Sequence, residues 1–212
     1  MTNLIIADHH PIIKEGLDHI LRDYDYTISN IIVDGADILT ELAGNVPDVL
    51  ILEIDLPNLL GLSSIKMIRR EFPGIKILIY SIHPEEMYAL SSIKAGAMGY
   101  VGKSSDIDVV FKAIEQVRKG GIYINDDLAE MLSKSQTSSS NNLAYKYKKL
   151  SSREIEVLNL LSSGNRNKDI AETLSINEKT VSTYKTRLLK KLDANSLAEL
   201  IKQARLLQTS DL

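Results

Sequence analysis

Five short apolar runs alternate with five longer amphipathic segments between residues 4 and 119, and this alternation constrains the fold more than any other feature. The apolar runs are rich in isoleucine, valine and leucine, as buried strands are, and lie at residues 4–7, 28–33, 49–52, 75–80 and 99–101. The amphipathic segments have helical spacing and lie at residues 11–22, 36–43, 62–71, 85–95 and 107–119. Strands that alternate with helices predict a parallel sheet covered on both faces, an α/β fold.

Charged and polar side chains follow several of these predicted strands. Asp8 and His9 come directly after the first strand, and Glu53 and Asp55 come after the third. In sheets of this kind ligands bind beyond the carboxyl ends of the strands, near the switch in strand order. Two carboxylates therefore stand where a buried strand leaves the core, and this edge of the sheet is the first candidate site.

The composition is that of a folded protein without covalent cross-links. The 212 residues are 44% hydrophobic and contain no cysteine, so neither disulfides nor thiolate metal cages hold the chain together. The apolar stretch at residues 4–7 is too short for a signal peptide, and no apolar run approaches the roughly 18 residues of a membrane span. We therefore expect a cytoplasmic protein without a membrane partner.

A polar segment divides the chain into two domains. Residues 133–142 read SKSQTSSSNN, five serines in ten residues without an apolar side chain, which is typical of a linker. We predict an α/β domain at residues 1–127, a linker at residues 128–148 and a second domain at residues 149–212. The second domain has 11 Lys or Arg against 8 Asp or Glu, a net charge of +3, whereas the remainder carries −6. The second domain is thus the better partner for a polyanion.

The second domain is predicted to be all-α, with four helices. Ser151 and Glu154 form an S-x-x-E capping box at the start of the first helix, and Gly164 offers its C-terminal stop. A three-residue turn at residues 175–177 separates the second helix from the third. The last three helices are expected at residues 168–174, 178–192 and 197–207. Two helices joined by so short a turn, the second of them basic, indicate a helix-turn-helix.

The helix at residues 178–192 has the composition of a nucleic-acid-binding element. Five cations stand against Glu178 alone, a net charge of +4 over 15 residues: Lys179, Lys185, Arg187, Lys190 and Lys191. An apolar stripe suits packing against the first two helices and consists of Val181, Leu188, Leu189 and Leu192. Another side carries short hydroxyl side chains that suit base edges and thymine methyls: Ser182, Thr183 and Thr186.

These helical segments resemble the LuxR-type helix-turn-helix of NarL/FixJ-family response regulators. The likeness rests on LSSREIEVL, NKDIAETL, KTVSTYKTRLLKKL and SLAELI, and KTVSTYKTRLL is especially similar to the BvgA/EvgA branch. The resemblance implies a homodimer whose third helix enters the major groove of double-stranded DNA, with the fourth helix pairing two subunits over an inverted repeat. It implies base contacts from Ser182, Thr183 and Thr186. Further DNA contacts, mainly to phosphates, are expected from Asn167, Lys168, Lys179, Thr180, Lys185, Arg187 and Lys190.

This helix-turn-helix usually follows a receiver domain, and residues 1–125 resemble one. HPIIKEGL and SIKAGAMGYVGK carry most of the likeness, which implies a flavodoxin-like fold with a five-stranded parallel sheet. A receiver takes a phosphoryl group from a histidine kinase or a small phosphodonor onto an aspartate beside an acidic Mg²⁺ pocket. By resemblance Glu53 holds the phosphoacceptor position, Asp8, His9 and Asp55 the acidic pocket, and Ser81, Tyr100 and Lys103 the switch positions.

Two residues depart from the receiver pattern. Glu53 stands where the family has the phosphorylated aspartate, and His9 where it has the second acid of the pair. Imidazole is a poor ligand for Mg²⁺, so we expect weak or absent Mg²⁺ binding and no resident metal or cofactor. The extra methylene shifts the carboxylate by about 1.5 Å, enough to disfavour ordinary phosphorylation. The extra methylene also extends the carboxylate toward Lys103 or Ser81, where it could imitate a phosphoryl group. The alternative is that the receiver is inert and serves only for dimerisation.

The hypothesis is a DNA-binding transcriptional response regulator that acts independently of aspartyl phosphorylation and is not an enzyme. One alternative is a conventional switch phosphorylated at Glu53 or Asp55, and another is a dimerising adaptor that does not bind DNA. A third is a metal-dependent hydrolase, or a transition-metal site, built from Asp8, His9, Glu53 and Asp55. The remaining histidines are interpreted as structural or ordinary residues without a functional partner: His10, His19 and His83.

Overall fold

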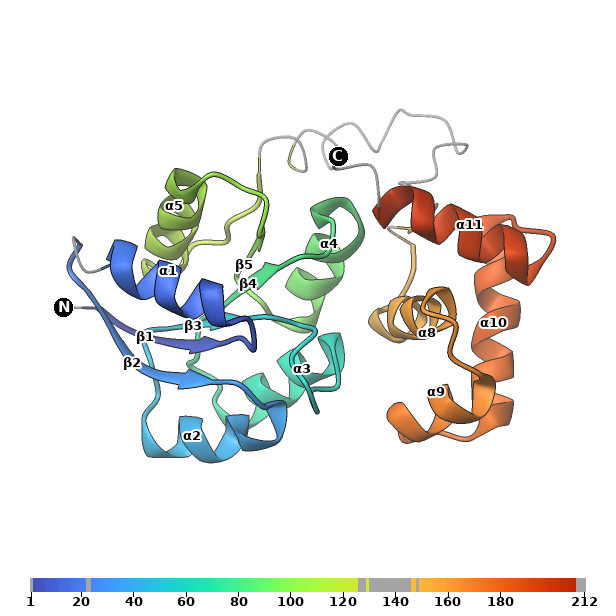
Figure 1. The fold of residues 1–212 in the computed structure, drawn as a ribbon, viewed down its shortest axis with the longest axis horizontal. Coiled ribbons are helices and arrows are strands. Elements are labelled where there is room, and N and C mark those ends of the chain that lie inside the picture. The colour runs from blue at the N-terminus through green and yellow to red at the C-terminus, as the bar shows by residue number, and fades with distance from the viewer. Residues whose placement is uncertain (1, 22–23, 126–128, 130–145, 148, 209–212) are drawn as a thin grey trace. The chain divides into compact units, whose positions relative to one another are not determined.

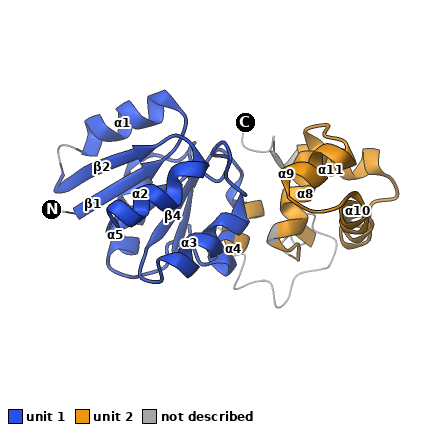
Figure 2. Cartoon of the chain, turned by 90° about the horizontal axis from the view of Figure 1, so that it is seen from below, with its two compact units in different colours: residues 1–85, 92–125 blue, residues 86–91, 126–212 orange. Residues whose placement is uncertain are grey.

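The computed structural model of the chain describes residues 2–21, 24–125, 129, 146–147 and 149–208 (Figure 1). The chain divides into two compact units, residues 1–85 with 92–125 and residues 86–91 with 126–212 (Figure 2). The first unit contains the whole sheet, and the second contains the four C-terminal helices. The predicted linker segment 133–142 lies outside the described residues. None of the helices in the described part of the chain combines the length and apolar character that crossing a bilayer requires.

Five parallel strands form one sheet in the order β2-β1-β3-β4-β5, which confirms the predicted fold. The strands are β1 (Thr2–Ala7), β2 (Tyr26–Ile32), β3 (Val49–Leu52), β4 (Ile77–Ser81) and β5 (Gly99–Gly102). The connecting helices are α1 (Pro11–Leu21), the 3-10 helix η1 (Gly35–Asp37), α2 (Ile38–Gly44), α3 (Leu62–Glu71), α4 (Glu85–Ala95) and α5 (Ile107–Arg118). The strand order switches direction between β1 and β3, so the carboxyl ends of these two strands lie at the switch point.

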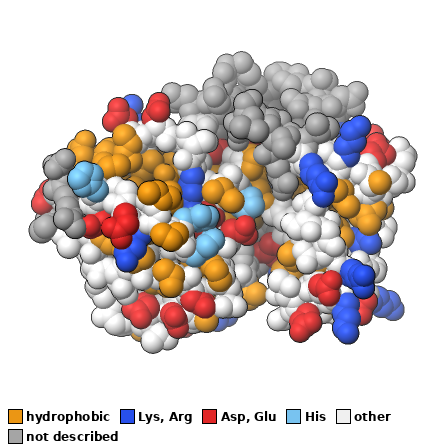
Figure 3. All heavy atoms as spheres, viewed as in Figure 1, with side chains coloured by type: hydrophobic (Ala, Val, Ile, Leu, Met, Phe, Trp, Pro, Cys, Tyr) orange, Lys and Arg blue, Asp and Glu red, His pale blue; other side chains and the backbone are white. Residues whose placement is uncertain are grey.

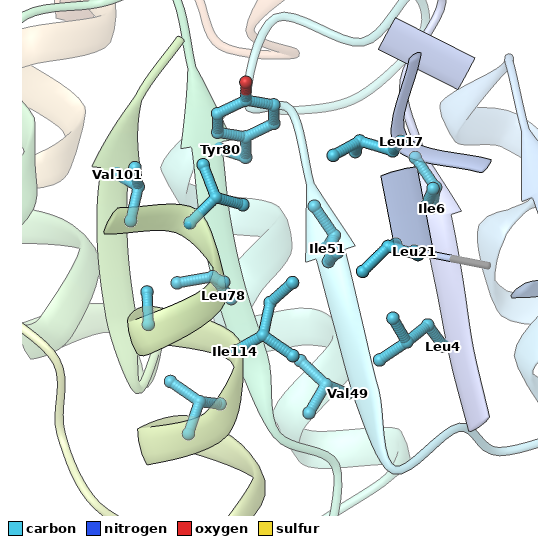
Figure 4. Packing of buried hydrophobic residues seen from close by; sticks show 13 residues of the cluster. Leu4, Ile6, Leu17, Leu21, Val49, Ile51, Leu78, Tyr80, Val101 and Ile114 are labelled. Atoms are coloured by element: carbon cyan, nitrogen blue, oxygen red, sulfur yellow. The ribbon is translucent and has the colours of Figure 1, made fainter. Parts of the chain in front are cut away.

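The sheet is buried because helices cover both of its faces (Figure 1). On one face, side chains of the strands pack against α1 and α5 (Figure 4): Leu4, Ile6, Val49 and Ile51 with Leu17, Leu21 and Ile114. All four residues of β3 are buried, as a continuous apolar run predicts for a central parallel strand. The chain therefore passes directly from the core to the polar residues that follow β3.

Element boundaries differ from the predicted ones by one or two residues, and one difference affects the site. Ser81, expected to follow the fourth strand, is instead the last residue of β4. It pairs with Gly102 across the sheet, and its carbonyl accepts a hydrogen bond from the Lys103 amide at 2.7 Å. Pairing with β5 thus extends β4 by one residue and buries Ser81 completely.

The second unit contains α8 (Ser152–Ser162), α9 (Asn167–Thr173), α10 (Glu178–Leu192) and α11 (Leu197–Gln208), the four predicted helices. The capping box is confirmed, because the Ser151 side chain accepts from the Glu154 amide and the Glu154 carboxylate accepts from the Ser151 amide. Gly164 lies just beyond α8 with φ of +86°, and its amide donates to the Leu161 carbonyl at 3.0 Å. It therefore ends the helix as predicted, in the left-handed conformation that glycine adopts most easily.

The turn between α9 and α10 is one residue longer than predicted, because α9 ends at Thr173 and residues 174–177 separate it from α10. Ser175 adopts a left-handed φ of +51°, and the Ile176 amide returns to the Ala171 carbonyl at 2.9 Å, which closes the end of α9. The Asn177 side chain then accepts from the Thr180 amide at 2.8 Å and caps α10.

Val181, Leu188 and Leu192 form the buried side of α10, and Leu189 is only half-buried. Within the range predicted for the linker, Lys146 is tied to the end of α10, because its ammonium lies 3.4 Å from Asp193.

An ion pair between a buried carboxylate and an exposed lysine joins the start of α8 to α10. Lys191 Nζ lies 2.7 Å from Glu154 Oε2, and Glu154 is only 3% exposed. Burial by itself would raise the pKa of Glu154, but hydrogen bonds from Lys191 and Ser151 outweigh burial and hold the pKa below its usual value. A carboxyl group whose pKa is lowered by folding stabilises the fold above its unfolded pKa, and this stabilisation is lost as the pH falls through the folded pKa.

Replacing Lys191 with methionine should therefore lower the free energy of unfolding at neutral pH by about 1–2 kcal/mol, because Glu154 loses a charged hydrogen-bond donor. The same change should make the loss of stability between about pH 5 and pH 3 smaller, because protonation of Glu154 then breaks fewer favourable contacts. Urea unfolding at a series of pH values measures both effects. Lys190→Met, at an exposed neighbouring position, is the matched control. An unchanged acid dependence in Lys191→Met would exclude this role for the pair.

Candidate functional site

The sheet brings four polar side chains together at the carboxyl ends of its strands. Asp8 follows β1, Glu53 follows β3, Ser81 ends β4 and Lys103 follows β5. Asp8 is 3% exposed, Glu53 1%, and the Lys103 side chain 8%. Because parallel strands end at the same edge of a sheet, residues far apart in the sequence meet there. These four residues are called the sheet-edge cluster below.

The Glu53 carboxylate contacts two members of this cluster at once. Its Oε1 atom accepts a hydrogen bond from the Ser81 hydroxyl at 2.6 Å, and its Oε2 atom lies 2.8 Å from Lys103 Nζ. The Asp55 amide also donates to Oε1, at 3.1 Å. Each oxygen of the carboxylate therefore has a short polar contact, as a buried charge requires.

Lys103 is shared between the two buried carboxylates. Its ammonium lies 2.6 Å from Asp8 Oδ2, in addition to its contact with Glu53. His10 completes the group, because its Nδ1 atom lies 2.7 Å from Asp8 Oδ1 and 3.0 Å from Lys103 Nζ. Interpreting His10 as a purely structural residue missed these contacts. Its position two residues after Asp8, immediately before α1, is the sequence signal that could have identified them.

Two residues predicted for the acidic pocket lie outside the buried cluster. Asp55 has a side chain that is 62% exposed and lies 3.4 Å from His83 Nε2, while His9 is exposed and its ring lies 4.1 Å from that of His10. Histidine and acidic side chains gather on one face of the molecule (Figure 3). The hydrogen bond with His83 lowers the pKa of Asp55, and burial opposes this effect without cancelling it. The interpretation of His83 as a residue without a partner was wrong.

His83 also links the cluster to the predicted switch residue Tyr100. The His83 amide donates to the Ser81 hydroxyl oxygen at 3.3 Å, and the Tyr100 hydroxyl donates to the His83 carbonyl at 2.9 Å. Tyr100 lies in β5 and is completely buried. A continuous chain of hydrogen bonds therefore runs from Glu53 through Ser81 and His83 to Tyr100.

The receiver resemblance implies an Mg²⁺ site, and the donor set here fits that ion poorly. Asp8, His9 and His10 each offer a ligand atom, and these atoms lie within 4.8 Å of one another. Two of the three ligands are imidazoles, whereas Mg²⁺ prefers oxygen ligands in strict octahedral geometry. The Lys103 ammonium already lies against Asp8 and Glu53, where a metal bridging these carboxylates would compete with it.

The second candidate site is the solvent-facing side of α10. Most of the residues predicted to contact DNA are exposed: Lys168, Lys179, Ser182, Thr183, Thr186, Arg187 and Lys190. The other three are half-buried: Asn167, Thr180 and Lys185. Asn167 joins α9 to α10, because its amide donates to Ser182 Oγ at 3.2 Å and its carbonyl oxygen accepts from Lys185 Nζ at 3.2 Å. Tyr184, which sequence reasoning missed, lies under the Arg187 guanidinium, 5.9 Å from ring centroid to Cζ.

Two protein families match the chain. Residues 4–115 match the response regulator receiver domain, and residues 148–204 match bacterial regulatory proteins of the luxR family. A receiver joined to a LuxR-type helix-turn-helix defines a DNA-binding response regulator, the class of protein that both candidate sites indicate.

Known relatives extend over nearly the whole chain. The oxygen regulatory protein NreC of Staphylococcus epidermidis is 34% identical over 208 residues, which is 95% of each protein. The positive transcription regulator BvgA of Bordetella pertussis is 33% identical and covers 96% of this chain and 97% of its own. RcsB from Salmonella enterica serovar Typhimurium, solved with promoter rprA and the phosphomimetic BeF3⁻, is 25% identical with a TM-score of 0.77, covering 95% and 97% of the two chains. This protein belongs to the NarL/FixJ family of response regulators, as its motifs predicted.

Proposed function

We propose that this protein is a transcription regulator whose receiver is held in its active arrangement by Glu53 rather than by an aspartyl phosphate. It acts in the cytoplasm as a homodimer on an inverted-repeat site in double-stranded DNA. The two families support the class of regulator. In addition, the Glu53 carboxylate takes the place of the phosphoryl group.

The observation that carries the proposal is the pair of contacts made by the Glu53 carboxylate. One oxygen accepts from the Ser81 hydroxyl at 2.6 Å, and the other lies 2.8 Å from the Lys103 ammonium. A hydroxyl and a lysine are the groups with which receivers of this family sense phosphate. A phosphoryl group would offer three oxygens and a charge of about −1.5 to −2. A carboxylate offers two oxygens and one charge, which is enough to engage both sensing groups at the same time.

The chain of hydrogen bonds from Ser81 to Tyr100 supports an effect beyond the cluster. The Ser81 oxygen accepts from the His83 amide, and the His83 carbonyl accepts from the Tyr100 hydroxyl. A change in the position of the Ser81 hydroxyl is therefore transmitted to a fully buried aromatic side chain. Glu53 thus stabilises one arrangement of the loop between β4 and α4.

Conventional phosphorylation is disfavoured by the same geometry. Glu53 is 1% exposed, and both of its oxygens are engaged, so attack on a phosphodonor would require breaking these contacts. Phosphoryl transfer also relies on metal ions to neutralise charge, and the donor set around Asp8 suits Mg²⁺ poorly.

The DNA-binding half of the proposal rests on α10. Its exposed side carries lysine, arginine and hydroxyl side chains, and its opposite side packs into the helical unit. The relative RcsB was solved bound to promoter DNA, which supports the same role for α10 in this chain.

Shortening Glu53 to aspartate tests the proposal directly. The aspartate carboxylate falls about 1.5 Å short and loses its simultaneous contact with Ser81 and Lys103. We expect untreated Glu53→Asp protein to bind DNA about ten-fold more weakly than the wild type, within the usual range of coupling between two sites. Glu53→Gln, which keeps the length and removes the charge, should also weaken binding. Band shifts with the untreated full-length proteins, together with their oligomeric state, provide the measurement.

Three results would contradict the proposal in different ways. Equal DNA affinity in all three proteins would show that Glu53 does not activate the receiver. A stoichiometric phosphoryl group on the wild type after acetyl phosphate and Mg²⁺, detected by intact mass, would favour a conventional switch at Glu53 or Asp55. Complete failure of the untreated wild type to bind any DNA would favour a dimerising adaptor.

A further inference from the structure

Three hydroxyl side chains on the exposed side of α10 donate their protons to the helix itself. Ser182 Oγ donates to the Glu178 carbonyl at 3.1 Å. Thr183 Oγ1 donates to the Lys179 carbonyl at 3.0 Å, and Thr186 Oγ1 donates to the Ser182 carbonyl at 3.1 Å. Serine and threonine often bond back to the preceding turn in this way. Because a hydroxyl has a single proton, none of the three retains a donor for a base.

Ser182 is constrained further by α9. The Asn167 amide donates to Ser182 Oγ, which occupies one of its two lone pairs, and the Asn167 carbonyl oxygen accepts from the Lys185 ammonium. Asn167 is therefore a positioning residue, because it fixes the orientation of one hydroxyl and ties one lysine to α9. The Arg187 guanidinium is likewise placed over the Tyr184 ring.

The exposed side of α10 thus offers bases a restricted chemistry. Ser182, Thr183 and Thr186 present oxygen lone pairs, and the two threonines also present methyl groups. In the major groove, adenine N6 and cytosine N4 are donors to such lone pairs and guanine offers only acceptors, whereas a C5 methyl is found only on thymine. Guanine is read by arginine or lysine donors, whereas Arg187 and Lys185, which Asn167 holds near α9, are expected to contact phosphates.

We infer that α10 selects A·T pairs at the positions that Thr183 and Thr186 contact. Thymine methyls pack against the methyl groups of Thr183 and Thr186, and the free lone pair of Ser182 accepts from an adenine or a cytosine amino group. The inference rests on the proposed DNA-binding role of α10, and it adds the base preference of that surface. Reading guanine at these positions would require a hydroxyl to rotate and abandon its bond to the helix.

Selection of duplexes from a random library by the untreated full-length protein tests the base preference. The selected sites should carry A·T pairs at the positions that Thr183 and Thr186 contact. Replacing each thymine in turn by deoxyuridine removes only the C5 methyl. At two positions in each half-site this replacement should weaken binding about four-fold, the effect expected for one buried methyl group.

Two matched variants assign the contact to its side chain. Thr183→Ser keeps the hydroxyl and removes the methyl, so one of the deoxyuridine effects should disappear. Thr183→Val keeps the methyl and removes the hydroxyl, so the same effect should remain. Selection of G·C pairs at the contacted positions, or an unchanged deoxyuridine effect in Thr183→Ser, would overturn the inference. A protein that binds duplexes without any base preference would overturn the inference alone, and one that binds no duplex would overturn the proposed DNA-binding function as well.

Discussion

Replacing Lys103 with methionine is expected to lower the free energy of unfolding of the receiver by about 3–5 kcal/mol. The Lys103 ammonium lies 2.6 Å from Asp8 and 2.8 Å from Glu53, and the two carboxylates are almost completely buried. Methionine fills a similar volume without a charge, so the variant leaves two buried carboxylates that repel each other. Removing one partner of a buried ion pair is costly because the remaining charge cannot return to water.

Hydrogen–deuterium exchange of peptides from β3 and β4 measures this loss, because their amides report the receiver separately from the helical unit. Lys66→Met is the matched control, since Lys66 lies on α3 and is exposed. It should change stability by less than about 0.5 kcal/mol. Equal protection of β3 and β4 in the two variants would show that Asp8 and Glu53 do not depend on the ammonium.

Removing Lys179 and Lys185 together is expected to weaken binding to all duplex DNA on the order of 50-fold at about 0.1 M salt. Both lysines lie on α10, Lys179 exposed and Lys185 held near α9 by Asn167. Each phosphate contact releases condensed counterions, so the loss of two contacts should reduce the slope of log K against log salt by about 1.8. The effect should be similar for specific and random sequences, because phosphates carry no sequence information.

Titrations of DNA at several salt concentrations measure both the loss of affinity and the change in the salt slope. Lys66→Ala removes a single positive charge from the receiver and should leave the slope unchanged. A double variant with the wild-type slope would show that neither lysine contacts phosphate. A loss confined to one sequence would indicate base contacts in place of phosphate contacts.

The fold could be predicted from local patterns in the sequence. The apolar run that forms β3 has no polar residue, and only a strand buried on both faces in a parallel sheet suits such a run. The capping box at Ser151 and the stop at Gly164 identified α8 by the same kind of local argument. Boundaries were less certain because they depend on pairing with a neighbouring strand, as the extension of β4 to Ser81 illustrates.

The site was predicted only in part. The sequence identified Asp8, Glu53 and Lys103 through their positions after strands and their resemblance to a receiver. It also grouped Asp55 with them, but the chain turns after β3 and leaves the Asp55 side chain exposed beside His83. The direction of a side chain in a turn depends on local backbone geometry, which the spacing of residues along the chain does not reveal.

By itself, the sequence determined the two folds and the family, and it predicted that glutamate and histidine occupy two positions where receivers have acids. These features depend on the type and spacing of residues along the chain, which can be read without knowing the tertiary contacts. Tertiary structure alone decided that the Glu53 carboxylate contacts Ser81 and Lys103 together, and that Asn167 of α9 contacts Ser182 and Lys185 of α10. The physical reason is that hydrogen bonds require correct distance and direction between atoms, and the first set of contacts joins residues that only the closed sheet brings together.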